Sequence, residues 1–399
     1  MTLPYNPRVD VIRGSPTRKI DAVREKLARE GRDIILLSTG QPGFPPPREL
    51  REWLAEKLKE DSTKLYSYTP TPGVLPLREA IALDVARFGG PKLSPEQIVA
   101  TAGGQEAMFA SLSVVLEPGD KVLLLDPTYF GYQPIIEYLG GRVVRLHTSV
   151  ENGFQPDEEE AKKVFEEHRV KAVVIVSPDN PTGRVITEES AKLLADLAVE
   201  RNAWILVDEA YRTLVFEGEN PWVYKYAPDN TIGIDTFSKD PGMPGWRLGF
   251  VYGPEWVVQK IRMVSEELVY CPPSFAQHAI AWYLTNEEVR VKHVMYAREF
   301  LKTRRDAMAD ALRKYLPEAK FLLAQGGMFI YVDLSAYIAG RMSSEELARL
   351  LLEKASVATV PGTYFSERGE TSIRLSYATE KPERIEEGIK RIAEVLADL

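Results

Sequence analysis

Cysteine and histidine are scarce in this sequence. Cys271 is the one cysteine among 399 residues, so an internal disulfide is excluded and a reducing compartment is expected. The four histidines, His147, His168, His278 and His293, are scattered and lack the spacing of metal ligands. The sequence therefore predicts neither a disulfide scaffold nor a metal centre.

Long apolar runs and an excess of basic residues are also missing. No run approaches the roughly 20 residues of a membrane-spanning helix, and residues 1–16 contain no apolar signal-peptide core. The 50 Lys and Arg residues are outnumbered by 58 Asp and Glu residues, whereas surfaces that bind nucleic acid are normally basic. We therefore expect a cytoplasmic protein that binds neither membranes nor nucleic acid.

The order of apolar segments between about residues 95 and 253 predicts an α/β fold. Short β-rich runs alternate with helical patterns, which is typical of a parallel sheet covered by helices on both faces. The predicted strands are residues 98–101, 121–126, 142–147, 171–177, 204–209, 231–237 and 248–253. The predicted helices begin near residue 104 and span about 131–139, 157–168 and 187–200.

The pattern changes after residue 254. Long helices at about 254–267 and 286–315 lead to the short strands 328–334 and 372–377 and to a final helix near 381–397. A chain of this length is too long for one small core. We therefore expect a large domain followed by a smaller α+β domain.

Three polar motifs follow predicted strands, namely NPTG (180–183), DEAY (208–211) and FSK (237–239). Ligands of parallel sheets bind beyond the carboxyl ends of the strands. The NPTG motif supplies the amide of Asn180, although by itself it could be a plain turn. Asp208 ends an apolar strand, where a buried carboxylate needs a cationic partner or strong donors. A protonated ring nitrogen would satisfy it, and so would a salt bridge or a helix N-cap.

Two further features are weak by themselves. Gly103 and Gly104 form a turn between a strand and a helix, where free N–H groups can bind an anion. Many such turns contain glycine without binding anything. Tyr129, just past another strand, could stack on a flat ring, although an aromatic residue there is more often part of the core.

The most specific stretch surrounds Lys239. Hydroxyls at Thr236 and Ser238 and the guanidinium of Arg247 accompany this lysine. Together they suit an anionic aldehyde cofactor, which the lysine would bind as a Schiff base while the other groups bind its phosphate. Arg374 lies within an apolar strand, where a carboxylate should pair with it. That carboxylate could belong to a substrate or to an internal acid.

In their order, these motifs resemble the class I/II aminotransferases, the aspartate-aminotransferase-like branch of the fold type I enzymes that use pyridoxal 5'-phosphate (PLP). The resemblance implies a large PLP-binding domain, residues 46–285, with a mostly parallel seven-stranded sheet between helices. It implies a smaller α+β domain formed by the arm 1–45 and residues 286–399. The matching strings are TGQPGF (39–44), YTPTPGVLPLREA (68–80), TAGGQEA (101–107), DPTYFGY (126–132), NPTG (180–183), DEAY (208–211), SK…GWRLGF (238–250) and IRLSYA (373–378).

The resemblance also implies a role for each matching residue. Lys239 is the Schiff-base and proton-transfer residue, Asp208 pairs with the pyridine nitrogen, and Tyr211 and Asn180 donate to the phenolate oxygen. The stacking residue is Tyr129. The expected phosphate contacts are Gly103, Gly104, Gln105, Thr236, Ser238 and Arg247, with Tyr68 reaching the phosphate of the other subunit in a homodimer. The substrate's α-carboxylate is expected to bind Arg374, Asn180 and the backbone at Gly40.

The implied reaction moves an amino group from an L-amino acid to a 2-oxo acid by a ping-pong mechanism. The acceptor would be 2-oxoglutarate, pyruvate or glyoxylate. One aspartate-favouring branch of the family carries a lysine where this chain has Gln105, so strict aspartate specificity is not expected by that route. Arg13, Arg18 or Lys19 could replace that cation, although a solvated helix surface explains each of them better.

Two other functions fit some of the same features. A β-eliminating or C–S lyase would share the fold and the cofactor, because side-chain positioning decides which bond is weakened. A PLP-sensing regulator would also share them, but we expect such a protein to carry a basic DNA-binding module, which this sequence lacks.

Overall fold

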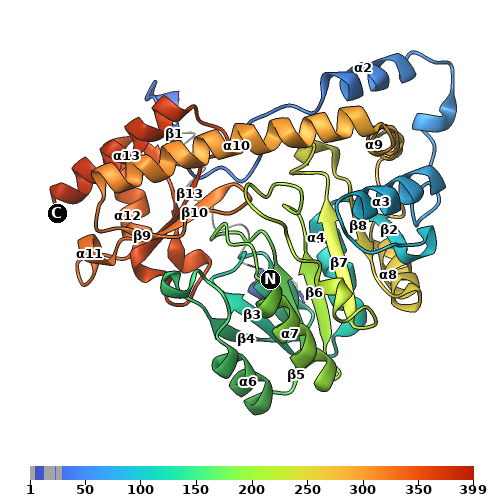
Figure 1. Cartoon of the computed structure of the whole chain (residues 1–399), viewed down its shortest axis with the longest axis horizontal. Helices are drawn as coiled ribbons and strands as arrows, with labels where there is room; N and C mark the ends of the chain where they lie inside the picture. The colour runs from blue at the N-terminus through green and yellow to red at the C-terminus, as the bar shows by residue number, and fades with distance from the viewer. Residues whose placement is uncertain (1–4, 13–22, 24–28) are drawn as a thin grey trace.

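A computed structural model describes residues 5–12, 23 and 29–399. Its centre is a seven-stranded sheet with the strand order β2-β8-β7-β6-β5-β3-β4 (Figure 1). Neighbouring strands are parallel except around β8, which runs antiparallel to both β7 and β2. The expected mostly parallel sheet is confirmed. The strands are β2 (Ile98–Thr101), β3 (Lys121–Asp126), β4 (Arg142–His147), β5 (Val170–Val176), β6 (Trp204–Asp208), β7 (Thr231–Thr236) and β8 (Gly249–Tyr252).

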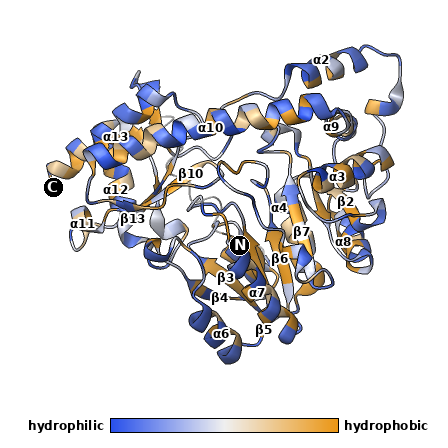
Figure 2. Cartoon of the chain, in the orientation of Figure 1, coloured by the Kyte–Doolittle hydropathy of each residue, from blue (hydrophilic) through white to orange (hydrophobic). Residues whose placement is uncertain are grey.

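The central strands are apolar on both faces because helices cover both sides of the sheet. In β3, Val122 and Leu124 pack toward α4 (Gly104–Val115), α5 (Tyr132–Tyr138) and α8 (Glu255–Leu268). Leu123 and Leu125 pack toward α6 (Glu158–Glu167) and α7 (Glu188–Glu200) on the opposite face. Figure 2 shows the result, an apolar sheet between helices with one polar and one apolar side.

Three helices that the sequence reading did not anticipate cover the end of the sheet near β2 and β8. They are α2 (Arg48–Lys57), α3 (Leu75–Arg87) and α9 (Ser274–Thr285). Their buried residues form one cluster with Ala100, Phe250 and Tyr252 of the sheet. Among the helices of the described residues, none is both long enough and apolar enough to cross a membrane.

The seven-stranded sheet and its helices form one layer of the molecule. A second layer contains a small antiparallel sheet with the strand order β12-β13-β10-β9. The strands are β9 (Lys320–Phe321), β10 (Phe329–Asp333), β12 (Val360–Pro361) and β13 (Ser372–Ser376). Three helices share its core, namely α10 (Glu287–Tyr315), α12 (Ser344–Leu350) and α13 (Pro382–Ala397). The N-terminal strand β1 (Ile35–Leu36) pairs in parallel with β11 (Val357–Ala358).

The long helix α10 connects the two layers. It begins beside α9 and ends beside α13 (Figure 1). Its last turns contribute Met308 and Leu312 to the core of the small sheet, while Arg290 in its first turns contacts Asp84 of α3. This arrangement leaves the carboxyl ends of β6 and β7 facing strand β13.

Candidate active site

A cavity of about 580 Å³ lies where the two layers meet. Its walls come from the carboxyl ends of β6 and β7, the start of α4, the loop after β1 and the strand β13. Most of the residues that the sequence singled out line it. These are Gly40, Gly104, Gln105, Tyr129, Asn180, Asp208, Tyr211, Thr236, Ser238, Lys239, Arg247 and Arg374.

Lys239 follows β7 and reaches across the cavity. Its Nζ donates a hydrogen bond of 2.6 Å to the carbonyl of Gly40 and lies 5.8 Å from the centre of the Tyr211 ring. Burial, with help from Arg374, lowers the pKa of the Lys239 amine to about 8, against the opposing effect of Asp208. About a tenth of this amine is therefore neutral, and so nucleophilic, at pH 7, far more than for an ordinary lysine.

Asp208 ends β6, the strand next to β7, and lines the same cavity. Its Oδ2 accepts a hydrogen bond of 2.6 Å from the hydroxyl of Tyr132, and its Oδ1 accepts one of 3.0 Å from the Ala210 N–H. Burial raises the pKa of the Asp208 carboxyl, while these two bonds and the charge of Lys239 act in the opposite direction. A cation placed against this carboxylate would relieve the cost of its burial.

The sequence reading missed Tyr132. This residue opens α5, three positions after Tyr129, and the two rings pack edge-on with their centres 5.3 Å apart. That spacing was a usable signal, but the partner, Asp208, is 76 residues away. Only the packing of α5 on the sheet brings the two residues together.

The turn before α4 and the loop after β7 form a cradle of donors. Gly103 has φ +92°, and a Cβ placed there would lie 2.5 Å from Nη2 of Arg247, so the position requires glycine. Arg247, itself left-handed at φ +51°, is held by the carbonyls of Pro244 and Ala102 at 3.0 and 3.1 Å. The hydroxyls of Thr236 and Ser238 lie 2.9 Å apart at the same end of the cavity. A helix N-terminus, two hydroxyls and a guanidinium suit a phosphate.

Arg374 is buried in the middle of the small sheet, 3% exposed. Its Nη1 donates to Oδ1 of Asn180 at 3.0 Å, and its Nη2 donates to the carbonyl of Ser38 at 2.9 Å. Both acceptors are neutral, and no partner within the described residues reaches Nε. Burial lowers the pKa of this guanidinium to about 10. The alternative of an internal Asp or Glu is therefore wrong for the part of the chain that the structure describes, and the charge of Arg374 is left for an anion.

The charges that line the cavity are unequal. Lys239, Arg247 and Arg374 supply three cations, and Asp208 is the only carboxylate among the lining residues that the structure describes. The phosphate cradle, the Tyr129 ring and the Arg374 guanidinium all line this one cavity. These residues fit PLP, which combines a phosphate, a flat ring and a basic ring nitrogen, together with the carboxylate of a substrate.

Other residues named from the sequence lie elsewhere. Tyr68 is outside the cavity and 83% exposed, with its ring packed edge-on against Tyr270 at 5.1 Å. Arg13, Arg18 and Lys19 lie outside the described residues.

Comparison with known proteins identifies the family. The model of the aminotransferases of class I and II matches residues 32–392. An aspartate/prephenate aminotransferase of Thermus thermophilus is 35% identical over 98% of both chains. An aromatic-amino-acid aminotransferase of Thermococcus litoralis is 32% identical over the same share of both chains. The solved structure of the Thermus thermophilus aspartate aminotransferase with maleate superposes with a TM-score of 0.92 at 34% identity, covering 99% of this chain and 100% of that one.

The fold, the residues of the cavity and the relatives all indicate an aminotransferase, rather than a protein that has the same fold and another activity. The chain belongs to the class I and II aminotransferases and is a PLP-dependent aminotransferase of fold type I.

Proposed function

We propose that Lys239 anchors PLP and carries the proton that transamination moves. The observation that carries this proposal is the position of its amine, which reaches the Gly40 carbonyl in the cavity that Asp208 also lines and has a pKa lowered to about 8. A neutral amine can attack the cofactor's aldehyde and, once released, can accept the proton of the substrate's Cα.

The remaining walls would hold the cofactor in one orientation. Asp208, oriented by Tyr132, would pair with the ring nitrogen, and Tyr211 and Asn180 would donate to the phenolic oxygen. Tyr129 would stack on the ring. The backbone at Gly103, Gly104 and Gln105 would bind the phosphate with Thr236, Ser238 and Arg247. Bound PLP supplies an electron sink that weakens the bond between the substrate's Cα and its hydrogen.

Arg374 would bind the α-carboxylate of the substrate, with the Asn180 side chain and the Gly40 backbone beside it. This contact would place Cα close to Lys239, whose Nζ already reaches Gly40. The same site would then bind a 2-oxo acid (2-oxoglutarate, pyruvate or glyoxylate) and return the amino group to it, giving ping-pong kinetics.

The donor range would be broad rather than confined to aspartate. Gln105 is neutral, and with Tyr129 and Phe130 it separates the cavity from a second one of about 740 Å³. Apolar side chains such as Ile12, Phe109 and Phe365 line that second cavity. The printed names of the relatives, aspartate/prephenate and aromatic-amino-acid aminotransferase, support a range that includes large apolar side chains.

We further propose a homodimer of two-domain subunits, with residues 46–285 forming the PLP-binding domain and residues 1–45 and 286–399 the smaller one. The separate apolar cores of the two sheets support this division. Exposed aromatic rings at Tyr66, Tyr68 and Tyr270 support a partner surface. Tyr68 would reach the phosphate bound by the other subunit.

Borohydride reduction of the PLP-loaded protein, followed by peptide mass mapping, tests the anchor. We expect the cofactor's mass on Lys239. Lys239→Ala should keep the fold but lose the covalent label and transaminate more than about a thousandfold more slowly. Lys225→Ala, at an exposed lysine away from the cavity, should behave like the parent. Near-parental turnover by Lys239→Ala would disprove the assignment.

A further inference from the structure

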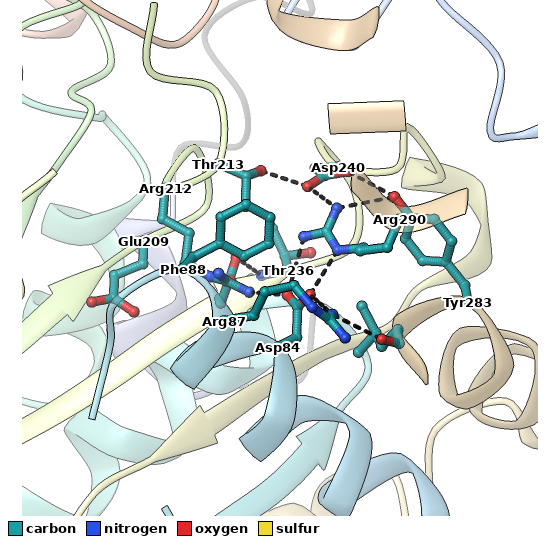
Figure 3. A network of polar contacts seen from close by, with 12 residues as sticks. Asp84, Arg87, Phe88, Glu209, Arg212, Thr213, Thr236, Asp240, Tyr283 and Arg290 are labelled. Carbon is teal, nitrogen blue, oxygen red and sulfur yellow. Dashed lines mark hydrogen bonds and ion pairs between the residues drawn. The ribbon is translucent and has the colours of Figure 1, made fainter. Parts of the chain in front are cut away.

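Several cofactor-pocket residues have a charged neighbour in the sequence whose side chain is buried in a separate cluster. Arg212 follows Tyr211, Asp235 precedes Thr236, and Asp240 follows Lys239. These three side chains are each less than 9% exposed, and none of them lines the cofactor cavity. Figure 3 shows Arg212 and Asp240 in this cluster, together with Asp84 of α3, Tyr283 of α9 and Arg290 of α10.

The charged side chains form one continuous chain of ion pairs. Arg290 joins two acids, since its Nη1 lies 2.7 Å from Asp240 and its Nε 2.8 Å from Asp84. Arg212 continues the chain, with Nη2 at 2.9 Å from Asp84 and Nε at 2.5 Å from Asp235. Asp84 is wholly buried and Arg290 is 2% exposed. We call the five residues Asp240, Arg290, Asp84, Arg212 and Asp235 the ion-pair chain.

Asp240, at one end of the ion-pair chain, has three polar partners. Besides Arg290, its carboxylate accepts a hydrogen bond from the hydroxyl of Thr213, and Tyr283 approaches its Oδ1 at 3.4 Å (Figure 3). Burial alone would raise the pKa of this carboxyl, but Arg290, His293 and Thr213 hold it below its ordinary value. Asp240 is therefore ionised at neutral pH, and moving it away from Arg290 would leave a buried charge unpaired.

These contacts fix the backbone on which Lys239 stands. Asp240 is joined to Lys239 by one peptide bond, and Thr213 lies two residues after Tyr211. The bond between Thr213 and Asp240 therefore ties the loop that carries Tyr211 to the loop that carries Lys239. Arg290 ties the Lys239 loop to α10, and Arg298 of the same helix ties the Tyr211 loop to it by donating to the Thr213 carbonyl at 2.7 Å. Fold stability alone does not call for such a chain, because apolar residues of similar volume often stabilise a core as well as buried ion pairs do.

We propose that Asp240 and Arg290 are positioning residues for Lys239. Through the ion-pair chain they hold its Cα so that the amine projects between Gly40 and Tyr211. The inference rests on the role proposed above for Lys239. Neither residue lines the cofactor cavity, so the expected effect is on how well the amine is placed.

Asp240→Asn tests this in the full-length protein. The variant keeps the size of the side chain and an acceptor for Thr213 but weakens the pairing with Arg290. We expect kcat to fall about tenfold, because misplacing a reacting group by a fraction of an ångström is costly. The KM for the amino donor should change by less than about twofold. After removal of bound cofactor, the visible band of added PLP should also form about tenfold more slowly, which measures placement of the amine independently of turnover.

Two further variants keep the test decisive. Thr213→Val removes one hydrogen bond to Asp240 and leaves every charge in place. It should lower both rates about threefold, even if Asp240→Asn fails to fold. Arg290→Lys should lower both rates as Asp240→Asn does.

Arg305→Lys is the matched control. Arg305 is also on α10 and 2% exposed, and it also pairs with carboxylates, those of Asp306 and Glu217. Arg305→Lys should lose about as much thermal stability as Asp240→Asn does. Its kcat and its rate of PLP band formation should both stay within about twofold of the parent.

The contrary result is that the variants of Asp240, Arg290 and Thr213 lose stability as Arg305→Lys does and yet keep the parental kcat and the parental rate of PLP band formation. That result would show that the ion-pair chain is only structural and that the inference is wrong. Failure of the proposed function would look different. Lys239→Ala would then still transaminate, whatever the Asp240 variants do.

Discussion

The hydroxyl of Tyr132 donates to the carboxylate of Asp208 over 2.6 Å. Hydrogen bonds to a charged group contribute about 1.5–3 kcal/mol. Tyr132→Phe should therefore raise the pKa of Asp208 further and weaken PLP binding at least about tenfold.

Titration of the cofactor-free protein with PLP, followed by absorbance, measures this loss. Tyr226→Phe is the control, because Tyr226 also donates to a carboxylate, Glu188, at 2.6 Å, but on the exposed side of α7. Equal PLP affinity of Tyr132→Phe and the parent would show that Asp208 does not need this donor.

The amine of Lys239 should titrate well below an ordinary lysine. Burial lowers its pKa from 10.5 to about 8, and only the neutral amine attacks an aldehyde. The rate at which cofactor-free protein binds PLP covalently should therefore rise with pH and level off above about 8. Stopped-flow absorbance between pH 6 and 10 measures the profile, with about one order of magnitude per unit below the midpoint. A rate still rising tenfold per unit at pH 9 to 10 would contradict the lowered pKa.

The same shift affects stability with a defined sign. The unfolded chain binds the proton of Lys239 up to pH 10.5, whereas the folded cofactor-free protein releases it near 8. The unfolded state therefore holds more protons between these values, and the contribution of Lys239 to stability rises with pH across that window. The contribution of Lys239 to the stability of the folded protein is therefore least favourable below pH 8.

Arg374→Lys should damage substrate binding and spare the cofactor. A lysine cannot reproduce the planar fork that holds Asn180 and the Ser38 carbonyl while binding a carboxylate. We expect the KM for amino acids to rise about thirtyfold or more, with the PLP band unchanged. Steady-state kinetics with alanine and with an aromatic donor measure this. Arg384→Lys, at a surface pair with Asp33, is the control. A parental KM in Arg374→Lys would remove Arg374 from the substrate site.

Gln105→Lys should shift the donor preference toward acidic side chains. The position lies at the start of α4 and on the cavity wall, so a lysine there can pair with a distal carboxylate. We expect kcat/KM for aspartate, relative to a neutral donor of similar length, to rise about tenfold. Gln259→Lys, on the exposed side of α8, should leave the ratio unchanged. An unaltered ratio in Gln105→Lys would place the distal end of the substrate elsewhere.

Much of the large sheet was predictable because each strand is a continuous apolar run. The expected strand at 121–126 coincides with β3, and the one at 171–177 differs from β5 by one residue at each end. The antiparallel direction of β8 was not visible, since strand direction depends on connections rather than on residue pattern. Short strands such as β11 and β12, two residues each, carry no periodic signal.

The site was predictable where motifs are local, as in the glycine turn and the residues around Lys239. It was not predictable where distant residues meet. Asp84 and Arg290 are 206 positions apart, and each alone would be taken for a surface charge on a helix. Tyr132 and Tyr211 both line the cavity and both lie in motifs of the family resemblance, but the resemblance implies a role for Tyr211 and none for Tyr132.

The most direct test uses the PLP-loaded protein and single amino acids, with no 2-oxo acid present. The visible band of the lysine-bound cofactor should convert to that of pyridoxamine phosphate, with one 2-oxo acid released per site, and the conversion rates should rank the donors. A band that no amino acid converts, or one that persists while ammonia and pyruvate accumulate, would contradict an aminotransferase centred on Lys239.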